Sequence, residues 1–270
     1  MQTTNLAPIG IFDSGIGGLT VAKTITESLP NENILYFGDT AHTPWGDKSL
    51  ATIQNYAVSI CRFLLENHCK CIVIACHTAS ATVHEAVCKT VGDTIPVFNV
   101  IDPVIQYISQ HYSSKRIGLI GTKQTIRSNT YHERLMTLNQ NIELVSLATP
   151  LLVPLIEEGF IENKASHLVV AEYLSHPKLT NIEALILGCT HYPLMKKHIN
   201  NFYQEKIDII DTSSLTAETL KQALKSQNLL NTEPNKTPER KFYVSDLSEF
   251  FIQTTERLFQ GKIHLQPYSL

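Results

Sequence analysis

The sequence predicts an α/β fold made of two similar domains, each built on a mostly parallel sheet. Short apolar runs of strand length alternate with helical segments along the whole chain, and part of this pattern recurs in its second half. The nine runs of strand length are 9–12, 34–37, 71–75, 96–100, 116–121, 142–147, 183–188, 207–210 and 241–244. They lack polar alternation, as strands of parallel sheets covered on both faces do. Strand and helix in alternation predict βαβ units.

The segments between the runs have helical period. The clearest apolar face consists of Leu50, Ile53, Ala57, Ile60 and Leu64. Asp102 before Pro103 has the pattern of an N-cap followed by a proline at the first helical position. Ser213 or Ser214 is predicted to cap the helix that follows it.

Two pairs of segments repeat at similar offsets. IGIFD at 9–13 is matched by IGLIG at 117–121, and IVIACHT at 72–78 is matched by LILGCTH at 185–191. Each match joins a predicted strand to the turn that follows it. The repetition predicts two related α/β domains.

Cys76 and Cys189 stand at the carboxyl ends of the second matched pair of strands, 113 residues apart. In open α/β sheets this end of the strands is where ligands bind. An isolated match would more often be a buried core cysteine. Here each cysteine is followed at once by a histidine and a threonine, in either order, and a core strand has no use for those polar groups.

Composition limits the classes of partner and compartment. The formal net charge is −3 without a run of basic residues, so nucleic acid and acidic membranes are not expected partners. No leader of the secretory type opens the sequence and no stretch has about 18 apolar residues, so a cytoplasmic protein is expected. Its six cysteines are then expected to be free thiols, most of them in the core. The spacing of Cys69 and Cys71 does not fit a zinc pair, and no metal site is predicted.

Two cysteines facing each other across a cleft suit racemisation. A base removes the α-proton from one face of an amino acid, and an acid returns a proton to the opposite face. A single cysteine beside a histidine would instead indicate nucleophilic catalysis. Ionising a thiol at pH 7 costs about 2 kcal/mol, of which a helix N-terminus returns about 0.3 to 2 kcal/mol. We therefore expect each thiol to be able to ionise during the reaction without being permanently charged.

Each thiol needs a neighbour that can hold or relay its proton. Asp13, in the turn FDSGIGG, is expected to reach Cys76, although an aspartate before a glycine-rich turn is often only a turn former. His191 and Glu157 are the candidates beside Cys189. The turn matches neither common nucleotide-binding pattern, so a nucleotide is not predicted.

Donors for substrate carboxylates lie near the predicted strand ends. The hydroxyl donors are Ser14, Thr78, Thr122 and Thr190. Backbone N–H groups after each strand are further donors. No lysine has the context of a pyridoxal phosphate site, and no cofactor is predicted.

Along nearly its whole length the sequence resembles the glutamate racemases, within the aspartate/glutamate racemase family. The motifs that carry the resemblance, in the family's order and spacing, are FDSGIGGLTV (12–21), YFGDTAHTPWGDKS (36–49), VIACHTASA (73–81), GLIGTKQTIRS (118–128), VPLIEEG (153–159) and LGCTHYPL (187–194). The resemblance implies a cofactor-independent racemase that makes D-glutamate for peptidoglycan in the cytoplasm, and a homodimer.

The resemblance also implies roles for individual residues. Cys76 and Cys189 would be the two acid/base residues, assisted by Asp13, His191 and either Glu157 or Glu158. The implied substrate contacts are Asp13, Ser14, Trp45, Gly46, His77, Thr78, Thr190 and His191. The implied fold has two domains related by a pseudo-twofold axis, with the active site in the cleft between them. The first comprises 1–101 and 212–270 and the second 102–211.

Two positions depart from the family pattern. His77 stands where the family usually has asparagine, and Trp45 where it usually has tyrosine. Histidine and tryptophan each keep a hydrogen-bond donor, which favours tolerated variation within one activity. The alternative is altered kinetics or substrate range.

Three other functions compete with glutamate racemisation. An aspartate racemase, or one of broader range on acidic amino acids, would share the fold, but relatives acting on aspartate tend to have an acidic residue where this chain has His191. A decarboxylase relative would keep one of the two cysteines. A catalytically silent homologue that binds a partner is suggested only by His77 and Trp45.

Overall fold

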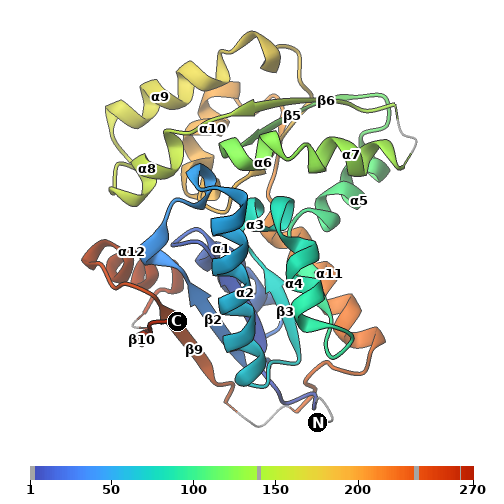
Figure 1. The fold of residues 1–270 in the computed structure, drawn as a ribbon. Coiled ribbons are helices and arrows are strands. Elements are labelled where there is room, and N and C mark those ends of the chain that lie inside the picture. The colour runs from blue at the N-terminus through green and yellow to red at the C-terminus, as the bar shows by residue number, and fades with distance from the viewer. Residues whose placement is uncertain (1–3, 139–140, 234–236, 262) are drawn as a thin grey trace.

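The strands of the computed structural model form two separate sheets, one in each half of the molecule (Figure 1). The structure describes residues 4–138, 141–233, 237–261 and 263–270. The six-stranded sheet contains β1 (Ile9–Asp13), β2 (Ile34–Gly38), β3 (Cys71–Ile74), β4 (Val97–Asn99), β9 (Arg240–Val244) and β10 (Leu265–Pro267). The four-stranded sheet contains β5 (Arg116–Gly121), β6 (Glu143–Ala148), β7 (Ala184–Gly188) and β8 (Asp208–Ile210).

The two sheets share one strand order. The larger runs β10-β9-β2-β1-β3-β4 and the smaller runs β6-β5-β7-β8, so β1 to β4 correspond in order to β5 to β8. Every strand pairing among the described residues is parallel. The α/β fold with two mostly parallel sheets is therefore confirmed, and the two matched segments of the sequence occupy equivalent strands.

Helices cover both faces of the larger sheet. The helical segments between its strands are α1 (Gly18–Ser28), η1 (Thr40–His42), η2 (Trp45–Asp47), α2 (Leu50–Glu66), α3 (His77–Thr82) and α4 (His84–Val91), followed near the end of the chain by α11 (Thr212–Ser226) and α12 (Glu249–Phe259). One apolar core lies between the sheet and α1, α11 and α12, and the other lies between the sheet and α2, α3 and α4. Four of the five apolar residues predicted for one face of α2 are buried, while Leu50 is exposed.

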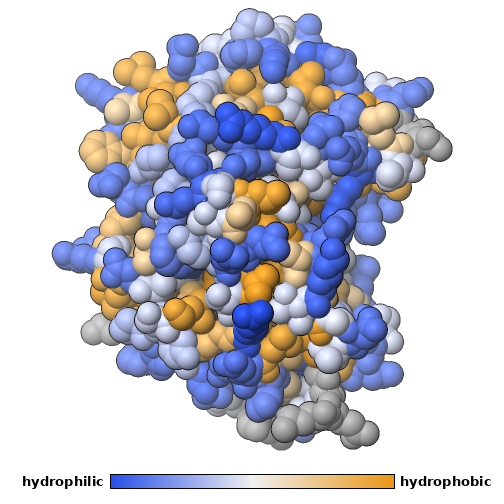
Figure 2. Space-filling view, viewed as in Figure 1, coloured by the Kyte–Doolittle hydropathy of each residue, from blue (hydrophilic) through white to orange (hydrophobic). Residues whose placement is uncertain are grey.

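The smaller sheet is also covered on both faces. Its helical segments are α5 (Asp102–His111), α6 (Lys123–Arg127), α7 (Thr130–Met136), α8 (Leu152–Glu157), α9 (Lys164–Leu174), η3 (Pro177–Leu179), η4 (Tyr192–Met195) and α10 (Lys196–Tyr203). α8, α9 and α10 enclose one core, and α5 and α7 enclose the other. On the face shown in Figure 2 hydrophilic side chains dominate and apolar ones form separate groups. Among the described residues no helix combines the length and the apolar character needed to cross a bilayer.

Some local predictions were wrong. α5 begins one residue earlier than expected, so that Ile101 is its N-cap and Asp102 its first helical residue. The N-cap of α11 is Asp211, whose carboxylate accepts the Ser213 backbone N–H, because this aspartate immediately follows β8. The short strand β10 was not predicted.

The predicted domain boundaries remain a prediction, but they fall at structural transitions. α5 begins at Asp102, directly after the larger sheet has received β4. α11 begins at Thr212, directly after β8, and packs on the core of the larger sheet.

A buried ion pair ties the amino ends of the larger sheet's strands to a neighbouring loop. Lys70 and Glu32 are both almost inaccessible to solvent and form a short charged hydrogen bond. Lys70 also donates to the backbone carbonyls of Asn5 and Leu229, at 2.6 and 2.8 Å, and Glu32 accepts the Asn231 backbone N–H. Every charged atom is thus compensated, as burial demands.

Replacing Lys70 with methionine should lower the free energy of unfolding by about 3 to 5 kcal/mol, because it leaves the Glu32 carboxylate buried and uncompensated. Urea denaturation followed by circular dichroism measures this. The matched control is Lys115→Met, whose partner Glu183 is exposed; its effect should stay below about 1 kcal/mol. Equal losses in the two variants would contradict this account of the buried pair.

Candidate active site

The carboxyl ends of β1, β3 and β7 converge on one pocket between the two sheets. Asp13 ends β1, Cys76 follows β3 and Cys189 follows β7. The pocket is lined by Ser14, Pro44, Trp45, Gly46, Cys76, His77, Thr78, Thr122, Val153, Cys189, Thr190 and His191. The structure therefore brings both predicted thiols and most of the predicted contact residues to a single place.

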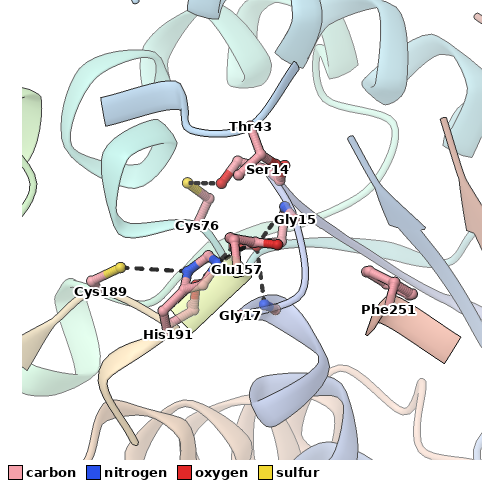
Figure 3. Close-up of polar contacts among 12 residues, drawn as sticks. Ser14, Gly15, Gly17, Thr43, Cys76, Glu157, Cys189, His191 and Phe251 are labelled. Carbon is pink, nitrogen blue, oxygen red and sulfur yellow. Dashed lines mark hydrogen bonds and ion pairs between the residues drawn. The ribbon is translucent and has the colours of Figure 1, made fainter. Parts of the chain in front are cut away.

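Cys76 is the N-cap of α3 and is buried. Its Sγ lies 3.6 Å from the Oγ of Ser14, which points to the sulfur in Figure 3. Burial and the nearby Asp13 carboxylate raise the pKa of the Cys76 thiol to about 12, against smaller lowering effects of the Ala79 amide and of Ser14. The expected help from the helix N-terminus is present but is outweighed, because desolvation penalises a buried thiolate more strongly.

Cys189 belongs to a chain of three polar groups. Its Sγ lies 3.6 Å from Nδ1 of His191, and Nε2 of His191 lies 2.5 Å from Oε1 of Glu157 (Figure 3). Burial alone would lower the pKa of His191, but its hydrogen bonds to Cys189 and Glu157 prevail and raise it well above its usual value. His191 is thus held as an imidazolium beside the sulfur. Glu157, and not the exposed Glu158, makes this contact.

The hydrogen-bond contact with Cys76 that was expected of Asp13 is made by Ser14. Asp13 itself holds the turn after β1 together and reaches the other half of the molecule. Its carboxylate accepts the backbone N–H groups of Gly15 and Gly18, at 2.9 and 3.0 Å. It also accepts the Thr190 hydroxyl at 3.2 Å. Burial raises the pKa of Asp13, although His191 and these hydrogen bonds act against the shift.

Three threonine hydroxyls form a short chain across the pocket wall. Thr78 Oγ1 lies 2.9 Å from Thr122 Oγ1, which lies 3.0 Å from Thr125 Oγ1. Thr122 is also the N-cap of α6. The chain joins an element of the larger sheet to one of the smaller sheet and holds hydroxyl donors at the pocket.

The two residues that depart from the family pattern form hydrogen bonds within the protein through their side-chain nitrogens. Trp45 Nε1 donates to the carboxylate of Asp39 at 2.9 Å. His77 has Tyr131 and Thr212 at its two ring nitrogens. Neither side chain therefore has a nitrogen left to donate to a substrate, contrary to the expectation from the sequence.

Sequence reasoning missed several residues that complete the site. Pro44 and Val153 line the pocket, and Asp39 holds the Trp45 ring. Pro44 lies in the motif 36–49, directly before the predicted contact Trp45, so this position could have indicated it. Val153 and Asp39 carried no signal beyond membership of longer motifs, because their roles arise from tertiary packing.

Two glycines allow the halves of the molecule to approach closely. A Cβ on Gly17 would lie 2.4 Å from Thr190 Oγ1, and one on Gly46 would lie 2.5 Å from Thr122 Cβ. Both distances are shorter than the contacts that Cβ atoms make in proteins, so a side chain at either position would push the halves apart.

The pocket is nearly closed. Its free space is about 10 Å³, enough for the centre of about one water molecule. An amino acid therefore needs the pocket to widen before it can bind. Among the residues that the structure describes, no three His, Cys, Asp or Glu side chains cluster as metal ligands.

Comparison with known proteins gives one consistent result. The model of the family described as Asp/Glu/Hydantoin racemase matches residues 19–220. A glutamate racemase of Geobacter metallireducens is 41% identical over 255 residues, which cover 94% of this chain and 93% of the relative. The crystal structure of glutamate racemase from Francisella tularensis in complex with D-glutamate is 41% identical, covers 98% of each chain and has a TM-score of 0.90. The crystal structure of glutamate racemase isoform RacE1 from Bacillus anthracis is 32% identical, with the same coverage and a TM-score of 0.91.

The imidazolium of His191 should make Cys189 the more reactive of the two pocket thiols, because the thiolate is the nucleophile. With iodoacetamide at pH 7, peptide mass spectrometry should show faster modification of Cys189 than of Cys76. His191→Asn should slow modification of Cys189 by about tenfold, while His111→Asn, at an exposed position, should leave it unchanged. Equal rates at the two cysteines, or no effect of His191→Asn, would refute the assignment.

Proposed function

The chain belongs to the Asp/Glu/Hydantoin racemase family and is an isomerase of the glutamate racemase type, and from this we propose that it interconverts L- and D-glutamate by two thiols. The observation that carries the proposal is the presence of Cys76 and Cys189 in one pocket, at equivalent strand ends of two sheets with the same order. The pair supplies one acid and one base without a cofactor.

We propose opposite starting states for the two thiols. Cys189, beside the imidazolium of His191, acts as the thiolate base and takes the α-proton of one enantiomer. Cys76, with its raised pKa, acts as the thiol and delivers its proton to the opposite face of the carbanion. One C–H bond breaks as an S–H bond forms on Cys189, and one S–H bond breaks as a C–H bond forms from Cys76. The reverse reaction begins from the exchanged states.

Glu157 and Asp13 act on the thiols through charge. Glu157 holds the proton on Nε2 of His191, which keeps the imidazole charged and orients Nδ1 toward Cys189. Asp13 opposes the charge of a Cys76 thiolate, which keeps Cys76 protonated before the reaction and makes its thiolate a stronger base in the reverse direction. Both residues assist the reaction in this proposal.

Substrate carboxylates would bind to the hydroxyls and amides around the pocket. The proposed contacts are Asp13, Ser14, Trp45, Gly46, His77, Thr78, Thr122, Thr190 and His191. The ring nitrogens of Trp45 and His77 are already hydrogen-bonded within the protein, so these two residues would contribute backbone N–H groups. Ser14 accepts from the Cys76 thiol and keeps its own proton for the substrate.

The wider role follows from the product. As the resemblance to the glutamate racemases implies, the D-glutamate would supply peptidoglycan synthesis in the cytoplasm. We also propose a homodimer with neither nucleic acid nor a membrane as partner, as the resemblance and the weakly acidic composition suggest.

Chiral chromatography of the purified protein incubated with L-glutamate, D-glutamate or L-aspartate tests the proposal. Either glutamate enantiomer should reach an equal mixture of the two. Aspartate should react at least about tenfold more slowly, since one methylene of fit is worth about 10- to 200-fold in specificity. Cys76→Ala and Cys189→Ala should each lower kcat by about 10²- to 10⁴-fold, while Cys88→Ala, at a partly exposed position outside the pocket, should not.

Each failure has a distinct meaning. Faster racemisation of aspartate than of glutamate would identify aspartate as the substrate. Turnover of neither amino acid would identify a binding homologue. Activity retained by either pocket variant would exclude the two-thiol mechanism.

A further inference from the structure

The side chain of His77 links three segments of the chain. The ring is buried at the first residue of α3, next to Cys76. Its Nδ1 lies 2.8 Å from the hydroxyl of Tyr131, and its Nε2 lies 3.0 Å from the hydroxyl of Thr212. The proposed mechanism makes no use of these contacts.

The two partners come from elements outside the larger sheet's own βα unit. Tyr131 lies on α7, which packs against the smaller sheet, and is itself buried. Thr212 is the first residue of α11, directly after the chain leaves β8 of the smaller sheet. The ring thus bridges the helix that carries Cys76, the body of the smaller sheet, and the connection between the two halves.

The chemistry of the link fits a neutral imidazole. One ring nitrogen donates and the other accepts, and each hydroxyl can take either role. Burial lowers the pKa of His77 to about 3, so the ring carries no charge at physiological pH. Both nitrogens are occupied, which leaves no side-chain group for a substrate.

Because the pocket is nearly closed, the hydrogen bonds of His77 bear on substrate entry. Substrate entry requires the pocket to widen. Separation of the halves stretches the bond from His77 to Tyr131, while Thr212 begins a helix packed on the larger sheet and lies in the same half as His77. When the halves close again, the bond to Tyr131 re-forms and returns α3 to the position seen in the structure. The hydroxyl chain from Thr78 to Thr122 crosses the same gap.

We propose that His77 is a positioning residue: its bond to Thr212 orients the ring, and its bond to Tyr131 is a latch between the halves that favours the closed state and fixes α3, with Cys76, over the substrate. The inference rests on the proposed racemase function. Because the latch favours closure and does not touch the reacting atoms, its loss should weaken substrate binding and leave the chemical step of the bound complex nearly unchanged.

Removing the partner hydroxyls tests the latch without altering His77. Tyr131→Phe and Thr212→Val should each raise KM for both glutamate enantiomers by about fivefold, the effect of one neutral hydrogen bond, with kcat within about twofold of the unmodified value. His77→Asn should also raise KM, and Tyr131→Phe added to it should have little further effect, because the shared bond is already lost. Tyr112→Phe is the control, since that hydroxyl binds Asp208 away from the pocket; its KM should be unchanged.

Small-angle X-ray scattering of the same variants without substrate adds a readout that needs no turnover. The radius of gyration should increase in Tyr131→Phe and Thr212→Val and stay constant in Tyr112→Phe. If the protein racemises nothing, the proposed function fails while the scattering still decides the latch. Unchanged KM and unchanged scattering in both partner variants would overturn the latch, as would a KM increase confined to His77→Asn, which would indicate direct contact with the substrate.

Discussion

The contact between the turn after β1 and the turn after β7 sets the geometry of the whole site. Thr190 donates its hydroxyl to Asp13, and its carbonyl accepts the Thr20 hydroxyl, both at 3.2 Å. Gly17 permits this approach, because any side chain there would meet Thr190 and His191. The contact joins the carboxyl ends of two parallel sheets, and the thiols that follow β3 and β7 therefore share one pocket.

Closure also gives the two thiols their different properties. Desolvation raises the pKa of Cys76, whose nearest polar partner is the neutral Ser14 hydroxyl. Cys189 is equally buried but has the imidazolium of His191 beside it, supported by Glu157. In a medium of low dielectric constant, such pairing decides where a charge is tolerated. Two sheets that share a strand order thus carry two thiols with different surroundings.

The sequence was sufficient for those features that depend on local pattern. All nine predicted strands are present, because an apolar run bounded by turns marks a buried parallel strand, and the repeat located the equivalent cysteines. β10 was missed because Leu265–Pro267 is short and has a single large apolar residue. The contact of Ser14 with Cys76 and the bridge made by His77 join distant segments, so no local pattern contained them. The hydrogen bond from Trp45 to Asp39 lies within one motif of the sequence.

The fate of the α-proton tests the central claim most directly. L-Glutamate incubated with the protein in D2O is stopped early, and each enantiomer is separated and analysed by mass spectrometry. Transfer between two thiols predicts D-glutamate with one deuteron at Cα, formed faster than deuterium enters the remaining L-glutamate, because different groups remove and deliver the proton. Retention of the original proton in the D-glutamate, or deuteration of both enantiomers at equal rates, would show that one group acts on both faces and would contradict the account.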